Sequence, residues 1–402
     1  MSIDSPRPEQ GSRDRLRAAS LDLARGAGSL RLPELLLFAA LVCEGSFGLP
    51  LPLNQVVLIA IILLGAMRRQ PIDPARFRLL VPVLALALFY IGVVSMFADP
   101  SEFASDWHRR LLRLSLTAIV VLVIGAGRLD LRSSIAGLCT GLVGNAVAFY
   151  VGLAPDYYGG VLSGFFEDKN VAGLAYAVFG VLLVGMAQRR RSRIILILGF
   201  GMLVWLTASR TSISAYLDGL AWILIAPRLR VLGRWVLGAV IYLGVNLASE
   251  DFSRIGTFSD REGSDLLRSR IDAASEIKVG DAGLLGDGLG EAYVVFDDEP
   301  GKTWFFHNSY WSALVEGGWP WLLLILGITV VVGLRPFTQV LDSREIALQA
   351  ATVALLICAW RLGEVLFTLQ WGVVMGMAIL VRAQHTEHAE PCRHPGPRDV
   401  AP

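Results

Sequence analysis

Long apolar runs alternate with short polar segments along most of the chain. A helix needs about 20 mostly apolar residues to cross a bilayer, and about twelve runs approach that length, or ten if the shortest are discounted. They lie at roughly 33–50, 53–67, 79–98, 111–127, 133–153, 170–187, 194–208, 211–227, 231–248, 308–333, 346–364 and 366–382. The pattern therefore predicts an all-α polytopic membrane protein. We find no internal repeat and no inverted pair of broken spans, which would be typical of a transporter.

The same pattern divides the chain into five parts. We expect an N-terminal tail, a bundle of about nine helices, a large external loop with short helices, about three further helices and a C-terminal tail. These parts cover residues 1–31, 32–248, 249–306, 307–382 and 383–402. The polar segment before the first run is too long for the n-region of a secretory signal, so we interpret that run as an uncleaved span.

Composition supports a membrane protein. Hydrophobic residues make up 54% of the chain and charged residues 18%, against about 45–50% and about 25% in average soluble domains. The net charge is only +1, which excludes a general basic surface for nucleic acid. With both termini in the cytoplasm, inner segments carry about twice as many cations as acids, and outer segments show the reverse. This asymmetry predicts that the 249–306 segment lies outside.

The cysteines and histidines give no sign of a metal or disulfide site. The four cysteines lie at positions 43, 139, 358 and 392, without metal-ligand or disulfide spacing. No cluster of His, Cys and acidic residues has the spacing of a metal site. We therefore expect buried apolar thiols, no metal and no cofactor.

The long external segment contains one predicted helix, over residues 264–277, with Ser264 as its N-cap. Arg270 falls inside the apolar arc of this helix, whereas Arg268 points away and can pair with Asp272. An arginine on an apolar stripe either binds an anionic partner or extends to the membrane interface. The apolar arc consists of Leu267, Ile271, Ala274 and Ile277.

Three polar motifs begin spans at their outer ends. In Ser163–Gly173, Asn170 suits an N-cap and Lys169 precedes it. In Thr207–Ser212, Ser209 or Thr211 can cap the helix beside Arg210. The third motif, Phe306–Trp311, has Asn308 or Ser309 as its cap after His307.

A helix N-terminus offers free N–H groups and a partial positive charge, so it can bind an anion. If these helices converge with Arg270, they form a phosphate site at the outer membrane surface. The alternative is that Lys169 and Arg210 only anchor helix ends at the interface. A helix N-terminus disfavours the imidazolium form of His307, so this residue can act as a general base. Alternatively, His307 bonds a loop carbonyl.

Several other features have ordinary structural interpretations. Gly286–Gly290 is glycine-rich, but no βαβ unit surrounds it, so we interpret it as a turn. Arg361 and Glu364 lie three residues apart in one predicted span and can pair with each other. Glu316 lies below His307, where it either orients the site or faces the bundle.

These motifs together resemble the O-antigen ligase and Wzy-type polysaccharide polymerase superfamily. Gly164-Phe-Phe-Glu-Asp-Lys-Asn-Val-Ala-Gly173 is similar to its glycine–aromatic–Lys/Pro-Asn–Gly motif, and Thr207-Ala-Ser-Arg-Thr-Ser212 to its Ser-Arg motif. Leu284-Leu-Gly-Asp-Gly-Leu-Gly290, His307-Asn-Ser-Tyr310 and Glu316-Gly-Gly318 follow in the family's order. The resemblance covers roughly residues 130–335. Glu167 and Asp168 depart from the family pattern and could neutralise Lys169.

The resemblance implies a metal-independent, GT-C-like glycosyltransferase of the bacterial inner membrane, with a periplasmic active site. Its donor would be an undecaprenyl-pyrophosphate-linked oligosaccharide. Arg210 and Arg270 match the family arginines that grip the pyrophosphate, and His307 matches the family histidine. The residues expected to bind substrate are Lys169, Asn170, Ser209, Asn308 and Glu316.

The resemblance leaves the acceptor open. A polymerase would join repeat units of a surface polysaccharide or exopolysaccharide, and Gly-Phe-Phe-x-x-Lys-Asn slightly favours this reaction. A ligase would transfer the glycan to lipid A-core. Family polymerases also imply a chain-length regulator or export proteins as partners. A transporter of lipid-linked sugars and a non-catalytic assembly factor are the alternatives from other classes.

Overall fold

The computed structural model describes residues 30–73, 78–251, 262–299, 301–339 and 342–389. Within these ranges the chain forms thirteen α-helices, α2 to α14, and one two-stranded antiparallel ribbon. The all-α prediction is confirmed except for this ribbon, which lies in the long segment between α10 and α12. Its strands are β1 (Tyr293–Val295) and β2 (Thr303–Phe305).

A helix covers each predicted apolar run. The first six are α2 (Leu32–Ala40), α3 (Leu53–Ala66), α4 (Leu80–Phe97), α5 (Trp107–Gly125), α6 (Leu131–Tyr150) and α7 (Lys169–Met186). The next three are α8 (Arg190–Leu206), α9 (Arg210–Ile225) and α10 (Val231–Asp251). After α11 (Glu262–Asp281) come α12 (Ser309–Ile328), the π-helical continuation η6 (Thr329–Leu334), α13 (Ser343–Arg361) and α14 (Leu369–Ala389).

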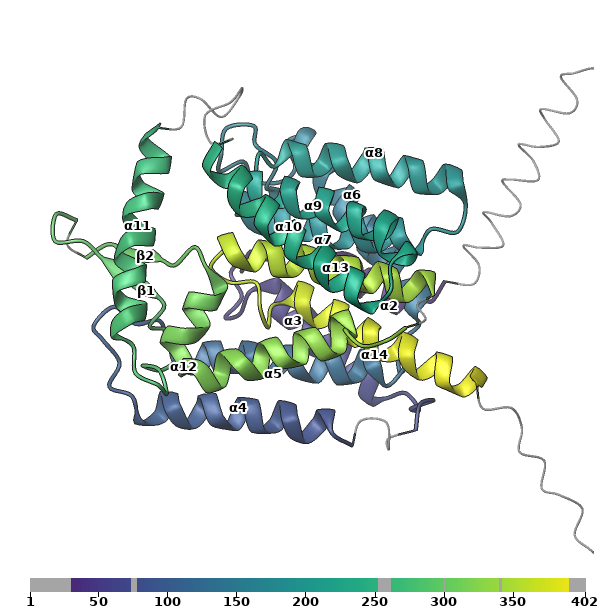
Figure 1. The fold of residues 1–402 in the computed structure, drawn as a ribbon, viewed down its shortest axis with the longest axis horizontal. Helices are drawn as coiled ribbons and strands as arrows, with labels where there is room; N and C mark the ends of the chain where they lie inside the picture. Colours follow the sequence, from purple (N-terminus) through teal and green to yellow (C-terminus); the bar gives the residue numbers. More distant parts are fainter. Residues whose placement is uncertain (1–29, 74–77, 252–261, 300, 340–341, 390–402) are drawn as a thin grey trace, which may run out of the picture.

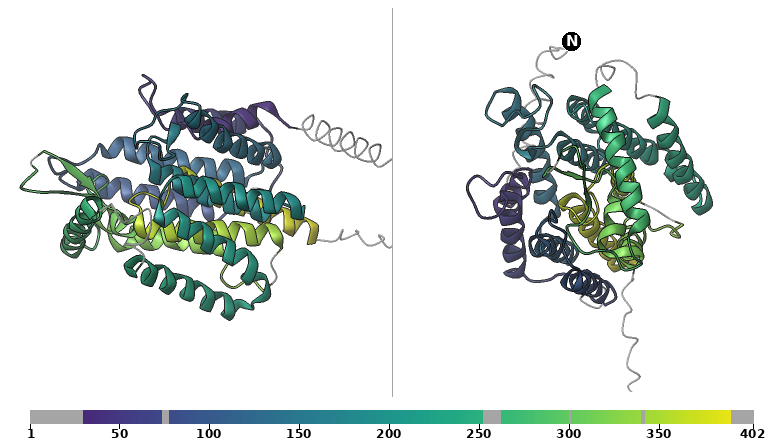
Figure 2. Two further views of the ribbon diagram at one scale, coloured as in Figure 1. Left: turned by 90° about the horizontal axis from the view of Figure 1, so that it is seen from above. Right: turned by 90° about the vertical axis from the view of Figure 1, so that its left-hand side faces the viewer.

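The helices other than α11 lie roughly parallel to one axis, and α11 crosses them at one end with the ribbon (Figures 1 and 2). We call this the α11 end. The helix starts of α7, α9 and α12 all lie there. The end of α7 contacts the start of α13, since a Cβ on Gly185 would lie 2.4 Å from the Ala347 Cβ. Because α13 is antiparallel to α7, the α7 start lies near Arg361, the last residue of α13.

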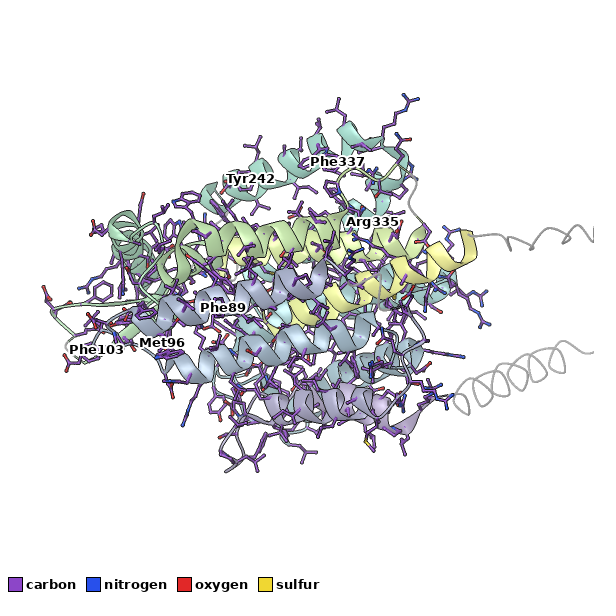
Figure 3. The ribbon with its side chains drawn as sticks, turned by 90° about the horizontal axis from the view of Figure 1, so that it is seen from below. Phe89, Met96, Phe103, Tyr242, Arg335 and Phe337 are labelled. Atoms are coloured by element: carbon purple, nitrogen blue, oxygen red, sulfur yellow. The ribbon has the colours of Figure 1, made fainter. Side chains whose placement is uncertain are left out.

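The outer surface of the bundle is apolar. On α4, Phe89 is 70% exposed and Met96 68% exposed, and both project outward from the bundle (Figure 3). Among the residues that the structure describes, five helices are long and apolar enough to cross a membrane: α4, α6, α7, α12 with η6, and α13. Exposed apolar side chains on helices of this length suit contact with lipid. The chain is therefore an all-α protein with the features of a membrane protein.

The first predicted span is interrupted. Helix α2 has only 9 residues, about 14 Å of helix at 1.5 Å per residue, and a loop then connects it to α3. Glu44 lies in this loop rather than inside a span. Within this loop Phe47 and Gly48 both have positive φ, so the backbone there is not helical. The bounds of the other helices differ less from the predicted ones. For example, α14 continues to Ala389, beyond the predicted limit at 382.

Helix α12 is broken within its first three turns. Gly318 has φ 65° and ψ −167°, which is outside the helical region. The glycine-rich segment 284–290 fills the break: Asp287 N donates to Val315 O at 2.7 Å, Gly288 N to Glu316 O at 2.9 Å, and Trp319 N to Leu284 O at 3.2 Å. The segment between α11 and β1 thus supplies hydrogen bonds that the broken helix cannot make for itself. The turn predicted over Gly286–Gly290 is confirmed, and its position explains its composition.

We expect Gly318→Ala to destabilise the protein. A Cβ at this position would lie 1.9 Å from Leu284 O, in a backbone conformation that disfavours L side chains. Strain and overpacking together should lower the free energy of unfolding by about 2–4 kcal/mol. Thermal unfolding in detergent measures this change.

Gly327→Ala in the same helix is the matched control. A Cβ at Gly327 has no heavy atom within 4 Å, and alanine favours the helix. Equal unfolding temperatures for the two variants would contradict the role assigned to the break.

Candidate functional site

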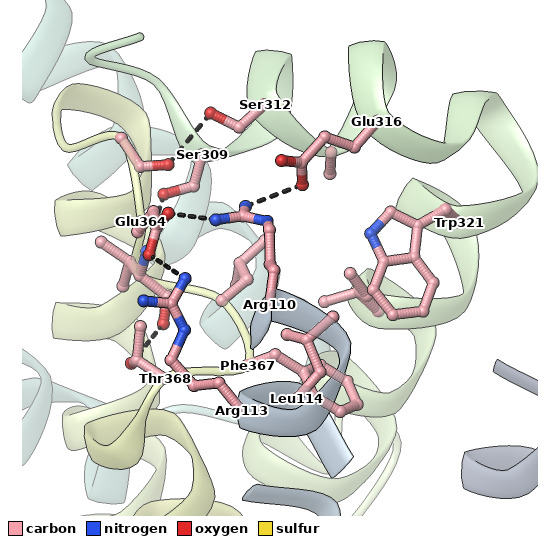
Figure 4. Close-up of a pocket in the computed structure, with 15 residues that line it drawn as sticks. Arg110, Arg113, Leu114, Ser309, Ser312, Glu316, Trp321, Glu364, Phe367 and Thr368 are labelled. Carbon is pink, nitrogen blue, oxygen red and sulfur yellow. Dashed lines mark hydrogen bonds and ion pairs between the residues drawn. The ribbon is translucent and has the colours of Figure 1, made fainter. Parts of the chain in front are cut away.

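Four charged side chains form an ion-pair cluster at the α11 end (Figure 4). Arg110 Nη2 on α5 donates to Glu316 Oε2 on α12 at 2.7 Å, and Arg110 Nη1 pairs with Glu364. Arg113 Nη2 donates to the second oxygen of Glu364 at 2.7 Å. We refer to Arg110, Arg113, Glu316 and Glu364 as the ion-pair cluster.

The cluster borders a polar cavity of about 30 Å³, enough for one water molecule. Two serines of α12 also line it and tie the helix to the loop after α13. Ser309 Oγ donates to Leu362 O at 2.6 Å and accepts from Val365 N at 3.0 Å. Ser312 Oγ donates to Gly363 O at 3.0 Å. The α12 start and this loop therefore form one rigid wall of the site.

Glu364 lies in the loop between α13 and α14, not in a span as predicted. Partial desolvation tends to raise the pKa of its carboxyl, but the guanidinium groups of Arg110 and Arg113 outweigh this and lower it to about 2. Its partners are these two arginines of α5, instead of the predicted Arg361. The negative charge at this point of the site is therefore fixed by two neighbouring cations.

His307 precedes Asn308, the N-cap of α12, and Asn308 Oδ1 accepts from Tyr310 N at 3.0 Å and Trp311 N at 3.3 Å. His307 Nδ1 lies 3.6 Å from Asp272 Oδ1 on α11. Four residues earlier on α11, Arg268 donates to Arg361 O at 2.7 Å. The face of α11 with Arg268 and Asp272 is therefore directed at the helix bundle.

The arginine expected in the phosphate site, Arg270, is engaged elsewhere. It forms an ion pair with Asp298, with Nη1 2.9 Å from Oδ2, and its guanidinium lies 3.9 Å from the centre of the Phe296 ring. Arg270 thereby lowers the pKa of Asp298. The structure brings Arg268, rather than Arg270, to the helix ends. The predicted apolar face does dock through Leu267, Ile271 and Ala274, although Ile277 is exposed.

The cap of α7 is Asp168 rather than the predicted Asn170. Asp168 Oδ1 accepts from Asn170 N at 2.6 Å and from Val171 N at 3.2 Å. Its other oxygen accepts from the Tyr158 hydroxyl at 2.9 Å. Lys169 is the first residue of α7 and lies 5.2 Å from the Tyr158 ring centre. The acid that departs from the family pattern therefore has a local structural role.

The loop before α7 is held from two sides. Asn145 Oδ1 on α6 accepts from Phe165 N at 2.7 Å, and Asn145 Nδ2 donates to Ser163 O at 3.2 Å. Glu44 N donates to Phe165 O at 2.9 Å. The loop 163–168 therefore has a fixed position beside the α2–α3 loop.

The α9 start lies against the α7 start. Ser209 is the N-cap of α9 and accepts from Ser212 N, one of the two predicted capping arrangements. A Cβ on Gly173 would lie 2.5 Å from Ser212 Oγ and 3.1 Å from Ser209 Cβ, so only glycine permits this approach. The structure therefore brings together Lys169, Asn170, Ser209 and Arg210, which come from two motifs.

Glu44 lies between these helix starts and the ion-pair cluster. Burial raises the pKa of its carboxyl to about 7; Arg113 opposes the increase, and Asp168, Glu364 and Glu167 add to it. These charged residues belong to α5, the loop before α7 and the loop after α13, so three separate parts of the chain influence the Glu44 carboxyl. In the sequence Glu44 lies within the apolar run at 33–50, and no local pattern marks it as a site residue.

Sequence reasoning missed Arg110 and Arg113 as site residues. A signal was present: they lie three residues apart at the start of an apolar run, so a helix places them on one face. Their partners, Glu316 and Glu364, lie more than 200 residues away. Neither pairing follows from local spacing.

We compared the chain with models of known protein families and with curated protein sequences, and nothing matches. The resemblance of its motifs therefore stays an expectation, and the geometry above is the basis for a functional proposal.

We expect Arg110→Gln to destabilise the protein by about 3–5 kcal/mol, because Glu316 would remain buried without its charged partner. The side chain of Glu316 is only 3% exposed. Thermal unfolding in detergent measures the change. The double variant Arg110→Gln/Glu316→Gln should recover most of the loss, since neither side chain then carries a charge.

Arg109→Gln is the matched control, because Arg109 is the neighbouring arginine and its side chain is 78% exposed. Equal unfolding temperatures for Arg110→Gln and Arg109→Gln would show that the ion-pair cluster does not stabilise this end of the bundle.

We expect Glu44→Gln to change how stability depends on pH. The pKa of Glu44 is higher in the folded protein, about 7, than its ordinary value of 4.5. The folded state therefore binds more protons between these values, and the wild type loses stability as pH rises through this window. Glu44→Gln removes this titration, so it should gain about 1–3 kcal/mol over wild type between pH 4.5 and pH 8. Parallel stability curves would refute this effect.

Proposed function

We propose that this protein is a membrane glycosyltransferase of the GT-C type that acts on glycan linked to undecaprenyl pyrophosphate. It would join repeat units of a cell-surface polysaccharide or exopolysaccharide at the periplasmic face of the bacterial inner membrane. The α11 end is the outer end predicted by the charge distribution, and the tails would lie in the cytoplasm. This proposal combines the resemblance of the motifs with the geometry of the α11 end.

One observation carries the proposal: three helices begin at the α11 end, and each start carries a cation or an imidazole. Lys169 and Arg210 occupy the first positions of α7 and α9, and His307 precedes the cap of α12. The partial positive charge of the helix dipole at each start favours a bound anion. The docked helix α11 covers this region with a second set of polar side chains. Such an arrangement suits a phosphate-bearing substrate at a membrane surface.

In the proposed reaction, Arg210 binds the pyrophosphate of the donor, and the lipid tail lies between helices. An acceptor hydroxyl oxygen forms a bond to the anomeric carbon, the bond from that carbon to the phosphate oxygen breaks, and undecaprenyl pyrophosphate leaves. His307 accepts the hydroxyl proton, and the Asp272 carboxylate, 3.6 Å from Nδ1, stabilises the imidazolium that forms. Arginine side chains stabilise the charge that develops on the leaving group.

To bind the donor, Arg270 must exchange its carboxylate partner Asp298 for a phosphate oxygen. Both groups are exposed, so this exchange involves no buried charge. Arg268 is already directed at the bundle, which makes α11 the source of cations for the site in either case.

The position of the ion-pair cluster favours a transferase over a transporter. A transporter of lipid-linked sugars would be expected to carry coupling charges near the bilayer midplane. The ion-pair cluster instead lies near the α11 end, with Arg110 in the first turn of α5 and Glu364 in a loop. We therefore interpret it as the frame of the outer site.

We expect His307→Ala and Arg210→Ala to abolish glycan transfer by the purified, reconstituted protein. Loss of a general base should lower the rate by about 10²–10⁴-fold, and loss of a charge-stabilising group by about 10²–10³-fold. The assay uses a synthetic lipid-linked repeat unit and measures product length by electrophoresis or mass spectrometry.

Arg109→Ala is the control, because it removes an exposed arginine from the same end of the bundle. A second arm adds lipid A-core: transfer to it, without chain growth, would identify a ligase instead of a polymerase. Wild-type rates in both alanine variants at equal protein levels would refute the assignment of the site.

A further inference from the structure

A large apolar cavity lies along α10, away from the ion-pair cluster. Its volume is about 660 Å³, within the range of about 300–1,000 Å³ typical of small-molecule sites. Gly238, Ile241 and Val245 of α10 line one side. Side chains of α12 and α13 line the other, including Leu326 and Val353. Its walls are therefore suited to a hydrocarbon chain.

The cavity extends along the helices from the α11 end of the bundle towards the opposite end. Its lining includes Tyr310 and Trp360, near the α11 end, and Arg234, in the first turn of α10 at the opposite end. From Arg234 to Asn246, α10 covers about 18 Å, more than half of a hydrocarbon core of about 30 Å. Figure 3 shows Tyr242 of α10 nearer the α11 end, and Arg335 and Phe337 near the opposite one. The cavity is therefore longer than the hydrocarbon thickness of one bilayer leaflet.

Arg234 is the one cation in the lining of this cavity. Only 5% of the surface of Arg234 is exposed. Nη2 donates to Thr338 O, but the buried Nε has no hydrogen-bond partner among the described residues. A buried charged donor without a full set of partners is costly. An anion bound at this end of the cavity would therefore supply the partner that the Arg234 guanidinium lacks.

We propose that the cavity binds an anionic diacyl phospholipid, with its phosphate on Arg234 and an acyl chain between α10, α12 and α13. The entrance has the aromatic residues of a membrane interface: Trp235 and Phe337 lie there with ring centres 6.2 Å apart. Aromatic and basic residues are enriched at that depth, and basic pockets between spans bind anionic headgroups.

The lipid tail of a glycan donor fits this end of the cavity poorly. A donor with its diphosphate at the α11 end would bring only hydrocarbon to Arg234, and the guanidinium would stay without an anion. A phospholipid whose headgroup lies at the opposite face satisfies both the charge and the apolar walls. This inference does not depend on the proposed transferase activity.

Native mass spectrometry of the delipidated full-length protein tests the proposal. Phosphatidylglycerol, phosphatidylcholine and undecaprenyl phosphate are added separately, and the bound fraction is measured. We expect phosphatidylglycerol to bind at least about tenfold more tightly than phosphatidylcholine, because the choline cation of the latter offsets the phosphate charge that pairs with Arg234. Equal binding of the two phospholipids would overturn the proposal.

Three variants locate the site. Arg234→Gln should weaken phosphatidylglycerol binding about tenfold or more, and Arg230→Gln, which removes an exposed arginine one turn earlier, should not. Gly238→Leu fills the cavity, where a Cβ at this position would meet only Trp222, at 4.0 Å. It should displace the lipid without altering charge. Thermal unfolding confirms that each variant is folded.

Two results would refute the site. One is that both Arg234→Gln and Gly238→Leu bind phosphatidylglycerol with wild-type affinity. The other is that Arg230→Gln loses as much phosphatidylglycerol affinity as Arg234→Gln. Binding of undecaprenyl phosphate in place of phosphatidylglycerol, independent of Arg234, would assign the cavity to the donor lipid instead.

Discussion

The break in α12 is the constraint on which the α11 end depends. At Gly318 the helix leaves its regular path, and its buried backbone groups must find other partners. The segment 284–290 supplies them, so the region between α10 and α12 is joined to the bundle by backbone hydrogen bonds. The same segment satisfies Glu316, whose Oε1 accepts from Gly290 N at 3.1 Å while Oε2 binds Arg110. One buried carboxylate thus links the segment 284–290, α12 and α5.

This arrangement explains why so many charges occur at one end of an apolar bundle. A buried carboxylate is stable only when it is paired and hydrogen-bonded. Arg110 provides the pair, and Glu364 and Arg113 complete a network that carries two charges of each sign. The network joins α5, α12 and the loop after α13. The helix starts with Lys169 and Arg210 lie around this frame, and none of them belongs to the network.

Local sequence signals predicted the helices and their starts well. Ser209 and Asn308 are caps, as their residue types indicated, because capping depends on the side chain and the next two or three N–H groups. The prediction of Asn170 as the cap of α7 was wrong, because Asp168, two residues earlier, also has a capping side chain and forms the cap. Arg270 shows a different limit: its helix was predicted, but the ribbon that brings Asp298 to it was not.

The sequence by itself determined the class of protein, the helix positions and the end of the bundle at which the polar motifs lie. These follow from hydropathy and from the periodicity of single helices, which are local properties. Only the tertiary structure decided which charges meet, that the glycine-rich segment fills the break in α12, and that α10 leaves a cavity ending at Arg234. The partners involved are mostly far apart in the chain. Their contacts depend on how helices pack, and no local pattern encodes that packing.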